Sequence, residues 1–261
     1  MEGCLDDSMY GMMTPTVAAM QLQHFYAEDQ IANGAVLVTI DKPSATDPFQ
    51  SLFVKWVESS YPPMIRSNRD FVYMEATGFT ELRDGKMVGY HILHSVHFPQ
   101  TPKVGNNIRG NMSICGLYRQ RNHNTVEVYI RALLKSGGHA FQTYAVKSAS
   151  IALISARKMI LCAHRNKLSW LLGQCDATVI RGEAKCIGCG QRPGIFATCI
   201  GSCALCKRAL CSSCKIKIEL GHVTLRGSLV KKKMWFCNYC LDRARQTSSR
   251  VVALEQYVQI V

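Results

Sequence analysis

The sequence predicts an α+β protein with two domains, in which an antiparallel sheet and a long helix precede a small cysteine-rich domain. Three observations predict this class. The first half of the 261-residue chain contains apolar, strand-like runs separated by turn signals. A long stretch of helix formers follows these runs. Eight of the 13 cysteines form four Cys-x-x-Cys pairs in the last third of the chain.

The strand-like runs predict a meander of about six antiparallel strands. Asp84-Gly85 is a hairpin turn signal, and Asn122-His123-Asn124 separates a second pair of runs. Apolar and polar residues alternate in the last run, which indicates one buried face and one wet or covered face. The predicted strands are residues 34–40, 52–57, 71–77, 87–93, 112–121 and 125–134.

Two helices are expected beside this sheet. The first covers residues 17–32, before the first strand. The second covers residues 145–172, where Ile151, Ile154 and further apolar residues recur near helical spacing and Gly173 is a stop signal. A curved antiparallel sheet that grips a long C-terminal helix is the helix-grip architecture.

Two segments of the predicted sheet, residues 69–78 and 84–96, resemble the START lipid-transfer domain. Residues 54–56 and 5–11 resemble the START-like branch that is fused to a FYVE-type finger. The resemblance covers residues 5–173 and implies a cavity for one sterol or lipid between sheet and helix. The match begins inside the family's domain, so the START-like domain is expected to lack its N-terminal part. A shortened sheet allows an open groove or an exposed edge in place of a closed pocket.

Several polar side chains in the predicted sheet invite a functional interpretation. His91, His94 and His97 lie within seven residues. On a strand, however, His91 and His97 share one face and His94 points to the other, which favours ordinary strand histidines over a metal site. Five further residues are expected to pair across strands or to project into a cavity, with cross-strand pairing as the default. They are Tyr73, Glu75, Arg119, Glu127 and Arg131.

The four Cys-x-x-Cys pairs predict two structural zinc sites. Tetrahedral Zn²⁺ takes four thiolates at about 2.3 Å, so four pairs complete two sites. Disulfides are not expected, because the N-terminus lacks the basic start and apolar core of a signal peptide. No βαβ pattern surrounds the pairs, which argues against thioredoxin-type redox chemistry. The remaining cysteines are predicted to be spectator thiols. These are Cys4, Cys115, Cys162, Cys175 and Cys199.

The intervals between the pairs are 13, 4 and 22 residues, and this order resembles the FYVE zinc finger. A RING usually replaces one central cysteine with histidine, and a zinc ribbon uses only two pairs. The resemblance implies a cross-brace, FYVE/RING-like finger with interleaved ligands and two zinc ions per chain. One zinc is expected on Cys186, Cys189, Cys211 and Cys214, and the other on Cys203, Cys206, Cys237 and Cys240.

The lipid-reading part of the FYVE signature is missing from this chain. FYVE fingers that bind phosphatidylinositol 3-phosphate carry an Arg/Lys-His-His-Cys-Arg cluster, but residues 199–206 contain no histidine or basic residue. The upstream Trp-x-x-Asp is absent, and the late Arg-Val-Cys reads Trp235-Phe236-Cys237. Other basic residues predict diffuse attraction to an anionic lipid surface, about 1 kcal/mol each. These candidates are Lys207, Arg208, Lys215, Lys217, Lys231, Lys232 and Lys233; Ile195 and Phe196 occupy the region of the membrane loop or pack in the core.

Charge and hydropathy limit the classes of partner that this chain can have. The formal charge is +13, and residues 176–261 carry 14 Lys and Arg against 5 Asp and Glu. A basic excess indicates an anionic partner, but no recognition helix or stacking pattern accompanies the cysteines, so nucleic acid is disfavoured. No apolar run approaches the roughly 18 residues needed to span a bilayer. We therefore expect a cytoplasmic protein, peripheral on membranes, with endosomal membranes implied by the FYVE resemblance.

These observations together predict a non-enzymatic protein, since no nucleophile, phosphate-loop or HExxH motif is present. Its expected parts are a START-like domain (1–175), a FYVE-related finger (176–245) and a tail with a short helix (246–261). The leading hypothesis is a lipid- or membrane-associated adaptor. The alternative is a protein-interaction module, of the kind that binds small GTPases, in which the finger binds no phosphoinositide. Nucleic-acid binding and a RING-type ubiquitin ligase are less favoured.

Overall fold

The computed structural model describes residues 1–29, 31–59, 68–135, 142–175, 185–192 and 201–258. The chain forms two compact units. Unit 1 comprises Met1–Ala163 and Ser249–Val261, and unit 2 comprises His164–Ser248. Unit 2 is therefore an insertion, because the chain leaves unit 1 and returns to it. These boundaries differ from the predicted ones at 175 and 245, since the end of the long helix joins unit 2 and the tail joins unit 1.

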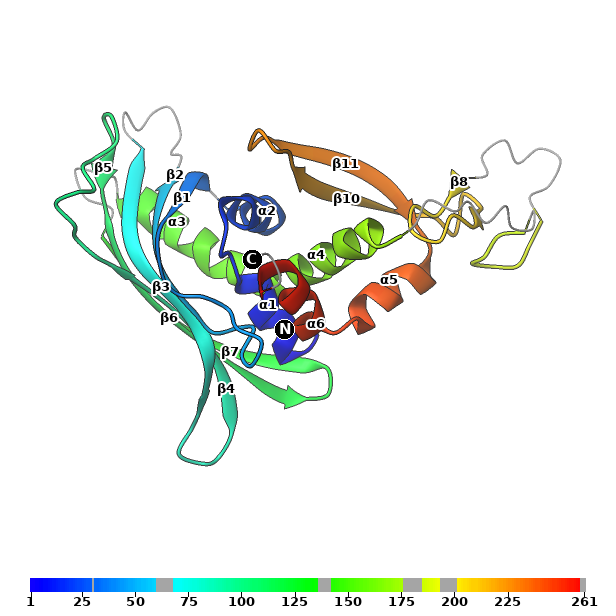
Figure 1. The fold of residues 1–261 in the computed structure, drawn as a ribbon, viewed down its shortest axis with the longest axis horizontal. Coiled ribbons are helices and arrows are strands. Elements are labelled where there is room, and N and C mark those ends of the chain that lie inside the picture. Colours follow the sequence, from blue (N-terminus) through cyan, green and yellow to red (C-terminus); the bar gives the residue numbers. More distant parts are fainter. Residues whose placement is uncertain (30, 60–67, 136–141, 176–184, 193–200, 259–261) are drawn as a thin grey trace. The chain divides into compact units, whose positions relative to one another are not determined.

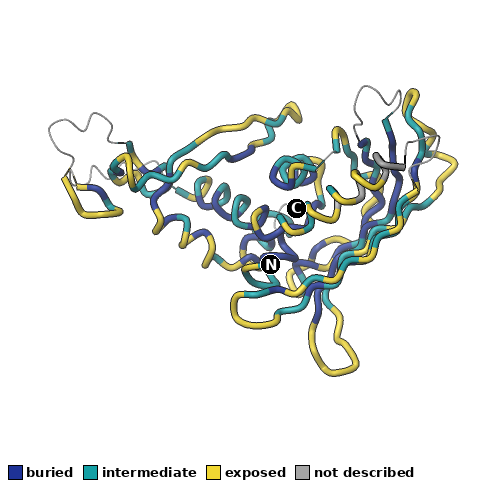
Figure 2. The backbone as a smooth tube through the Cα atoms, turned by 180° about the vertical axis from the view of Figure 1, so that it is seen from behind, coloured by how far each residue is buried: buried dark blue, intermediate teal, exposed yellow. Residues whose placement is uncertain are grey.

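Unit 1 is built on an antiparallel sheet that curves around helices (Figure 1). The strand order is β1-β2-β3-β4-β6-β7, which confirms the predicted meander, and a short β5 pairs in parallel with β3. Buried residues concentrate in the central strands, while the connecting loops are exposed (Figure 2). The strands are β1 (Ile31–Asp41), β2 (Ser51–Ser59), β3 (Arg69–Glu81), β4 (Met87–Ser95), β5 (Ile108–Arg109), β6 (Asn111–Asn122) and β7 (Thr125–Lys135).

Helices α1 (Leu5–Met12) and α2 (Val17–Ala27) precede the sheet. Each begins at a capping side chain: Cys4 Sγ accepts from the N–H of Asp7, and Thr16 Oγ1 accepts from the N–H of Ala19. Helix α2 is shorter than the predicted residues 17–32. It ends because Glu28 adopts the left-handed conformation, with φ of 55°, and turns the chain toward β1.

The predicted long helix over residues 145–172 consists of two helices. Helices α3 (Gln142–Ser155) and α4 (Met159–Gly173) are joined by a single 3₁₀ turn, η1 (Ala156–Lys158). Helix α1 crosses the start of α4 very closely. A Cβ atom on Gly11 would lie 1.9 Å from the carbonyl oxygen of Met159, so only glycine permits this crossing.

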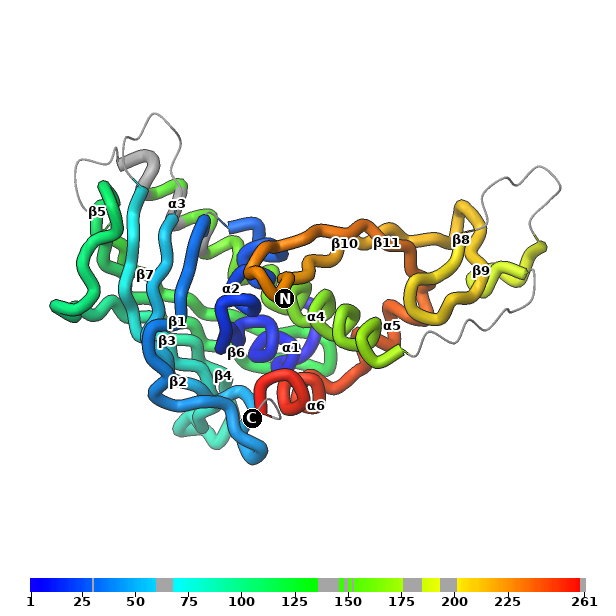
Figure 3. Tube along the Cα trace, turned by 45° about the horizontal axis from the view of Figure 1, so that its top comes forward, coloured from blue at the N-terminus to red at the C-terminus, as the bar shows by residue number. Residues whose placement is uncertain are grey.

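The end of the chain packs on α1 within unit 1. Helix α6 (Ser249–Ala253) and the π-helical turn η2 (Leu254–Val258) lie beside α1 (Figure 3). Val252 is fully buried, and Ser249 Oγ donates to Asp7 Oδ1 over 2.6 Å. The predicted short helix in the tail is therefore present, and it completes the core of unit 1.

Unit 2 surrounds a small core in which cysteines and large apolar side chains pack together. Its longest strands form the antiparallel hairpin of β10 (Ile216–Val223) and β11 (Leu229–Phe236). The other elements are the strand pair β8 (Gly201–Ser202) and β9 (Ala209–Leu210), and helix α5 (Asn238–Gln246). The core includes Leu168, Leu171, Leu205, Leu210 and Phe236.

Candidate functional site

A cavity of about 220 Å³ lies in unit 1 between the sheet and the helical segments α2, α3 and η1. Side chains at alternate strand positions face it, because the pleat directs every second residue to the same side of the sheet. Most of them are apolar, among them Val57, Phe71, Leu93, Ile114 and Leu134, and Met20 adds an apolar side chain from α2. The cavity is therefore suited to an apolar ligand.

One wall of the cavity carries a buried ionic cluster centred on Glu75. Glu75 Oε2 pairs with the ammonium of Lys55, which is fully buried and also donates to Thr14 Oγ1 over 2.6 Å. Glu75 Oε1 lies 2.7 Å from His91 Nε2. Burial opposes the ionised carboxylate, but the Lys55 charge and the His91 contact lower the pKa of Glu75 to about 2. The Glu75 carboxylate is thus ionised, and both of its oxygens have partners within the protein.

A second polar pair lines the cavity at the end of α2. His24 Nδ1 lies 2.7 Å from Asp29 Oδ2, and Asp29 Oδ1 accepts from the N–H of Ile31 over 3.0 Å. His24 Nε2 is buried without a hydrogen-bond partner among the described residues. The sequence does not indicate this pair, because a spacing of five residues matches no regular helix or strand pattern.

Among the other polar residues of the sheet, one pair forms across strands as expected and Tyr73 projects into the cavity. Arg119 is paired with Glu127 across β6 and β7, and Arg119 Nε donates to Glu127 Oε2 over 3.1 Å. Tyr73 faces the cavity, and burial raises the pKa of its phenol. His91 faces inward, whereas His94 is exposed and lies 3.2 Å from Ser113 Oγ. Within the described part of the chain, the histidines form no metal cluster.

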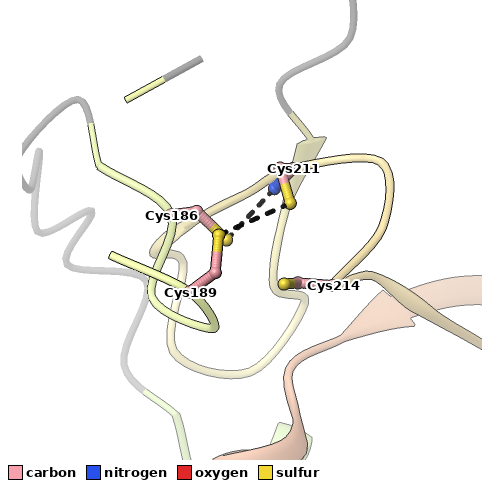
Figure 4. Close-up of side chains that lie close together, drawn as sticks. All are labelled: Cys186, Cys189, Cys211 and Cys214. Atoms are coloured by element: carbon pink, nitrogen blue, oxygen red, sulfur yellow. Dashed lines mark hydrogen bonds between the residues drawn. The ribbon is translucent and has the colours of Figure 1, made fainter. Parts of the chain in front are cut away.

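Unit 2 brings eight cysteines together in two clusters of four. Figure 4 shows the cluster that contains Cys186. Within each cluster all Sγ atoms lie within 4.8 Å of one another. Cys189 and Cys211 are 3.9 Å apart, and Cys206 and Cys237 are 3.8 Å apart, measured between Sγ atoms. Sulfurs bound at 2.3 Å to one tetrahedral ion would be about 3.8 Å apart. The clusters are Cys186, Cys189, Cys211 and Cys214, and Cys203, Cys206, Cys237 and Cys240.

In each cluster, backbone N–H groups contact one sulfur, that of Cys186 or Cys203, and favour its thiolate form. Cys186 Sγ accepts from the N–H groups of Gly188 and Cys211, over 3.4 and 3.3 Å. A hydrogen bond from Cys240, helped by backbone N–H groups, lowers the pKa of Cys203 to about 4. Thiolates are the form that binds metal, so each cluster is suited to hold one ion.

The residue after each of two cysteine pairs adopts a left-handed conformation. Gly190 follows Cys189 with φ of 72°, and Lys207 follows Cys206 with φ of 60°. Their N–H groups close the turns by donating to the carbonyls of Cys186 and Cys203, over 2.8 and 2.9 Å. The two turns are thus equivalent. At the second turn, however, a lysine and not a glycine adopts the left-handed conformation, which is unfavourable for residues with a side chain.

The predicted anionic-lipid contacts fall into two groups. Lys215 and Lys217 lie over the Trp235 ring, 4.7 and 5.4 Å from its centroid, and Lys231 and Lys233 occupy the same face of the hairpin by strand register. Lys232 points to the opposite face. Lys207 and Arg208 instead line an open hollow together with Arg243, which is not among the predicted contacts. Ile195 and Phe196 lie outside the described residues.

No protein-family profile matches this chain, and no curated protein matches it. Among solved structures it is similar to human STARD10, with 15% identity over 62% of this chain and a TM-score of 0.42. The chain spans 61% of the length of that protein. For the human StAR-related lipid transfer protein 5, identity is 14% over 60% of this chain and 70% of that one, with a TM-score of 0.44.

A STAR-related lipid transfer protein from Xanthomonas axonopodis has 16% identity over 61% of this chain and 81% of that one, with a TM-score of 0.42. All three TM-scores are below 0.5. We therefore base the function on the cavity and the cysteine clusters themselves. Among the helices described in the structure, none has the length and apolar character needed to cross a bilayer.

Proposed function

We propose that this chain is a non-enzymatic, START-like protein that holds a lipid-like ligand in unit 1 and carries a FYVE-related finger with two zinc ions in unit 2. It acts as an adaptor at membrane surfaces. The observation that carries the proposal is the apolar cavity of about 220 Å³. An apolar cavity of roughly 150 Å³ stays dry and binds benzene. The larger cavity of unit 1 therefore favours a ligand with an apolar body.

The two tetra-cysteine clusters support structural zinc. Four sulfurs complete the coordination of each ion and leave no open position for a substrate, which is typical of structural sites. Structural zinc contributes roughly 10–16 kcal/mol of apparent binding energy at neutral pH, and in small domains this energy is also folding energy. The ions would thus stabilise unit 2, whose apolar core is small.

The basic face of the β10–β11 hairpin supports contact with an anionic lipid surface. Lys215, Lys217, Lys231 and Lys233 share this face with Trp235. Tryptophan favours membrane interfaces because its ring is apolar and its N–H is polar. Each basic residue adds about 1 kcal/mol near an anionic leaflet. The face offers charge and one aromatic ring, so it favours general anionic attraction over recognition of one headgroup.

The cavity is tested by filling it. Ala132 lines the cavity on β7, whereas its neighbour Leu133 points outward and is 65% exposed. Ala132→Trp should abolish binding of octanol to the zinc-loaded full-length protein, and Leu133→Trp should leave it unchanged. Isothermal titration and ¹⁵N chemical-shift mapping measure the binding. If Ala132→Trp folds and binds octanol like the wild type, the cavity is not the ligand site.

Membrane association is tested by co-sedimentation with liposomes. Vesicles that contain phosphatidylinositol 3-phosphate are compared with vesicles matched in charge by phosphatidylserine. We expect equal pelleting that falls with added salt and is lost when Lys215, Lys217, Lys231 and Lys233 are replaced by glutamine. Replacing the exposed Lys86 of unit 1 serves as the control. Selective pelleting with the phosphoinositide would favour an endosomal address, and no pelleting would favour the protein-interaction alternative.

A further inference from the structure

The turn between β10 and β11 carries a leucine that does not pack against the rest of the chain. Leu225 is 109% exposed, the largest exposed fraction among the large apolar side chains of the described residues. Turn positions usually carry Gly, Pro, Asn, Asp or Ser, because these residues permit the turn or bond to its backbone. The turn itself therefore gives no reason for an apolar side chain at this position.

The backbone of this turn is fixed by hydrogen bonds. The N–H of Gly227 donates to the carbonyl of Thr224 over 2.9 Å, and the N–H of Thr224 donates to the carbonyl of Ser228 over 3.0 Å. Thr224 Oγ1 accepts from the N–H of Ser228 over 3.2 Å. Gly227 provides a left-handed conformation, with φ of 77°. The turn lies at the end of the hairpin away from the cysteine clusters (Figure 1), so an ordered turn presents Leu225 outward.

Three more apolar side chains lie directly behind Leu225. Val223 pairs with Leu229 in the strand register, and His222 pairs with Val230. Paired residues of antiparallel strands share a face, and successive residues alternate between faces. Val223 and Leu229 are half-buried on one face, and Val230 is 48% exposed on the other. We call Val223, Leu225, Leu229 and Val230 the apolar tip.

The hairpin is strongly basic directly behind the apolar tip. Residues 231–233 are three exposed lysines. Residues 216–236 contain five Lys and Arg and a single acidic residue, Glu219, which lies 3.9 Å from the Lys233 ammonium. Clusters of basic residues beside an apolar segment are attracted to anionic lipid headgroups. The charge of this hairpin is thus complementary to an anionic bilayer.

The spacing of apolar and basic residues matches the depth of a membrane interface. A strand rises about 3.3 Å per residue, so Lys231 lies about 7 Å behind Leu229 along β11. Amphipathic segments bury their apolar part about 5–10 Å into the boundary between headgroups and acyl chains. At that depth Lys231 would lie level with the headgroups. Arg226, in the turn itself, has a long stem that lets its guanidinium reach back to them.

We propose that the β10–β11 hairpin enters an anionic bilayer with its turn first, so that Leu225 reaches the acyl-chain boundary and the lysines at 231–233 contact the lipid phosphates. This inference rests on the proposed function, because it describes how the basic hairpin contacts the membrane, and it adds insertion to attraction by charge. A single exposed leucine is common on protein surfaces. Four apolar residues gathered at one ordered, basic turn are a stronger indication.

The turn between β3 and β4 provides a matched control. Met87 is 52% exposed at this turn and pairs with Glu81 in the strand register. The turn has two acidic and two basic residues, which are Glu81, Arg83, Asp84 and Lys86. Their charges cancel, so this turn has no attraction to an anionic surface. It offers an exposed apolar side chain without the basic residues of the β10–β11 hairpin.

The first experiment measures affinity for vesicles of phosphatidylcholine and phosphatidylserine by co-sedimentation of the full-length, zinc-loaded protein. Leu225→Ser should weaken binding roughly tenfold, because a leucine side chain is no longer transferred out of water. Leu225→Ile and Met87→Ser should bind like the wild type. Binding of Leu225→Ser should still fall with salt, since the lysines remain. Circular dichroism and zinc content check that each variant folds.

The second experiment measures depth. Lipids brominated on their acyl chains quench the fluorescence of tryptophans that reach the hydrocarbon. Leu225→Trp should show more quenching than the wild type, whose Trp56, Trp170 and Trp235 give the background. Met87→Trp should show only this background.

The outcomes separate insertion from membrane association. Weaker binding of Leu225→Ser together with quenching of Leu225→Trp would support insertion. If the wild type binds but Leu225→Ser binds equally well, or Leu225→Trp is not quenched, insertion is wrong and the contact is electrostatic, as first proposed. If the wild type does not bind these vesicles, membrane association and insertion fail together, and an acidic protein partner becomes the occupant to seek.

Discussion

Glu75 illustrates at the scale of a single residue how a sheet can hold a charge in its interior. The carboxylate and Lys55 are both buried, and each depends on the other for compensation of its charge. Removing one partner of a buried pair leaves an uncompensated charge, which costs about 3–5 kcal/mol. Glu75→Gln should therefore lower the free energy of unfolding of unit 1 by about that amount, as measured by urea denaturation.

A double variant provides the control for this prediction. Replacing both partners with apolar residues of similar size, as in Lys55→Met with Glu75→Leu, removes the charges together. Such replacements are often neutral or stabilising, so the double variant should be more stable than Glu75→Gln. If the single variant is as stable as the wild type, the Lys55–Glu75 pair does not contribute to the free energy of unfolding of unit 1 as proposed.

The same carboxylate makes stability depend on pH. The pKa of Glu75 is lowered to about 2, below its ordinary value of 4.5. A lowered pKa means that the folded state favours the ionised form, so this contribution is complete above about pH 4.5 and is lost as the pH falls toward 2. The wild type should thus lose more stability than Glu75→Gln between these pH values. Parallel urea titrations from pH 5 downward measure the difference, and equal slopes would contradict it.

The sequence predicted polar residues of this kind only in part. Strand alternation placed Glu75 and His91 on particular faces and made cross-strand pairing the default, as Arg119 and Glu127 illustrate. It did not indicate that Lys55 is fully buried, since a lysine in a strand is usually exposed. His24 and Asp29 were missed because their contact depends on a left-handed residue, Glu28, that the sequence does not mark with glycine.

At the scale of elements, α4 and α5 are joined by a buried lysine. Lys167 is fully buried, and its ammonium donates to the carbonyls of Arg245 and Thr247 over 2.8 and 3.0 Å. These carbonyls lie at the end of α5, where helical carbonyls lack partners within the helix. Lys167→Met should leave them unsatisfied and destabilise unit 2 by about 2 kcal/mol. Fluorescence of Trp170 and Trp235 during denaturation reports the change.

Arg245→Met is the matched control for this lysine. Arg245 pairs with Asp242 on the exposed surface of α5, over 3.0 Å. Exposed pairs of this kind contribute roughly 0.3–0.5 kcal/mol, so this variant should be close to the wild type. If Lys167→Met is equally mild, water or other donors replace its ammonium and the lysine is not the link between the two helices.

The positions of the elements were predictable where apolar and polar residues follow a regular pattern along the chain. Alternation and turn signals located the six main strands, although the observed strands extend beyond the predicted residues at most ends. The long helix was predicted as continuous because residues 156–158 contain no proline or glycine, yet the structure has a 3₁₀ turn there. Tertiary packing decides such a break, and the Gly11 crossing at Met159 lies directly after it.

At the scale of the whole molecule, the insertion of unit 2 into unit 1 was the feature least accessible from sequence. The sequence predicted a short helix in the tail, but the residues that contact it lie about 240 positions earlier, in α1. Ser249 and Arg250 bind Asp7 and Asp6, over 2.6 and 2.9 Å. No local pattern reports a contact of this separation. The cysteine clusters were accessible, because their spacing is itself the signal.

The insertion leads to a prediction about metal removal. The tail is held by contacts within unit 1, including the hydrogen bond of 2.5 Å from Tyr10 Oη to Gln256 Oε1 and the burial of Val252. None of these contacts involves a cysteine cluster. A chelator should therefore unfold unit 2, whose folding energy comes largely from metal, while the tail stays bound to α1 and the sheet persists.

Hydrogen exchange followed by mass spectrometry measures this outcome along the chain. After chelation, the amides of β10, β11 and α5 should lose protection, whereas those of α1, α6 and β3 should keep it. Cys186→Ser, which breaks one cluster, should give the same pattern without a chelator. A simultaneous loss of protection in α1 and α6 would mean that the metal-bound insertion holds the tail in place. Unit 1 would then depend on a folded unit 2 to bring the two ends of the insertion together, and the cavity would respond to metal as well.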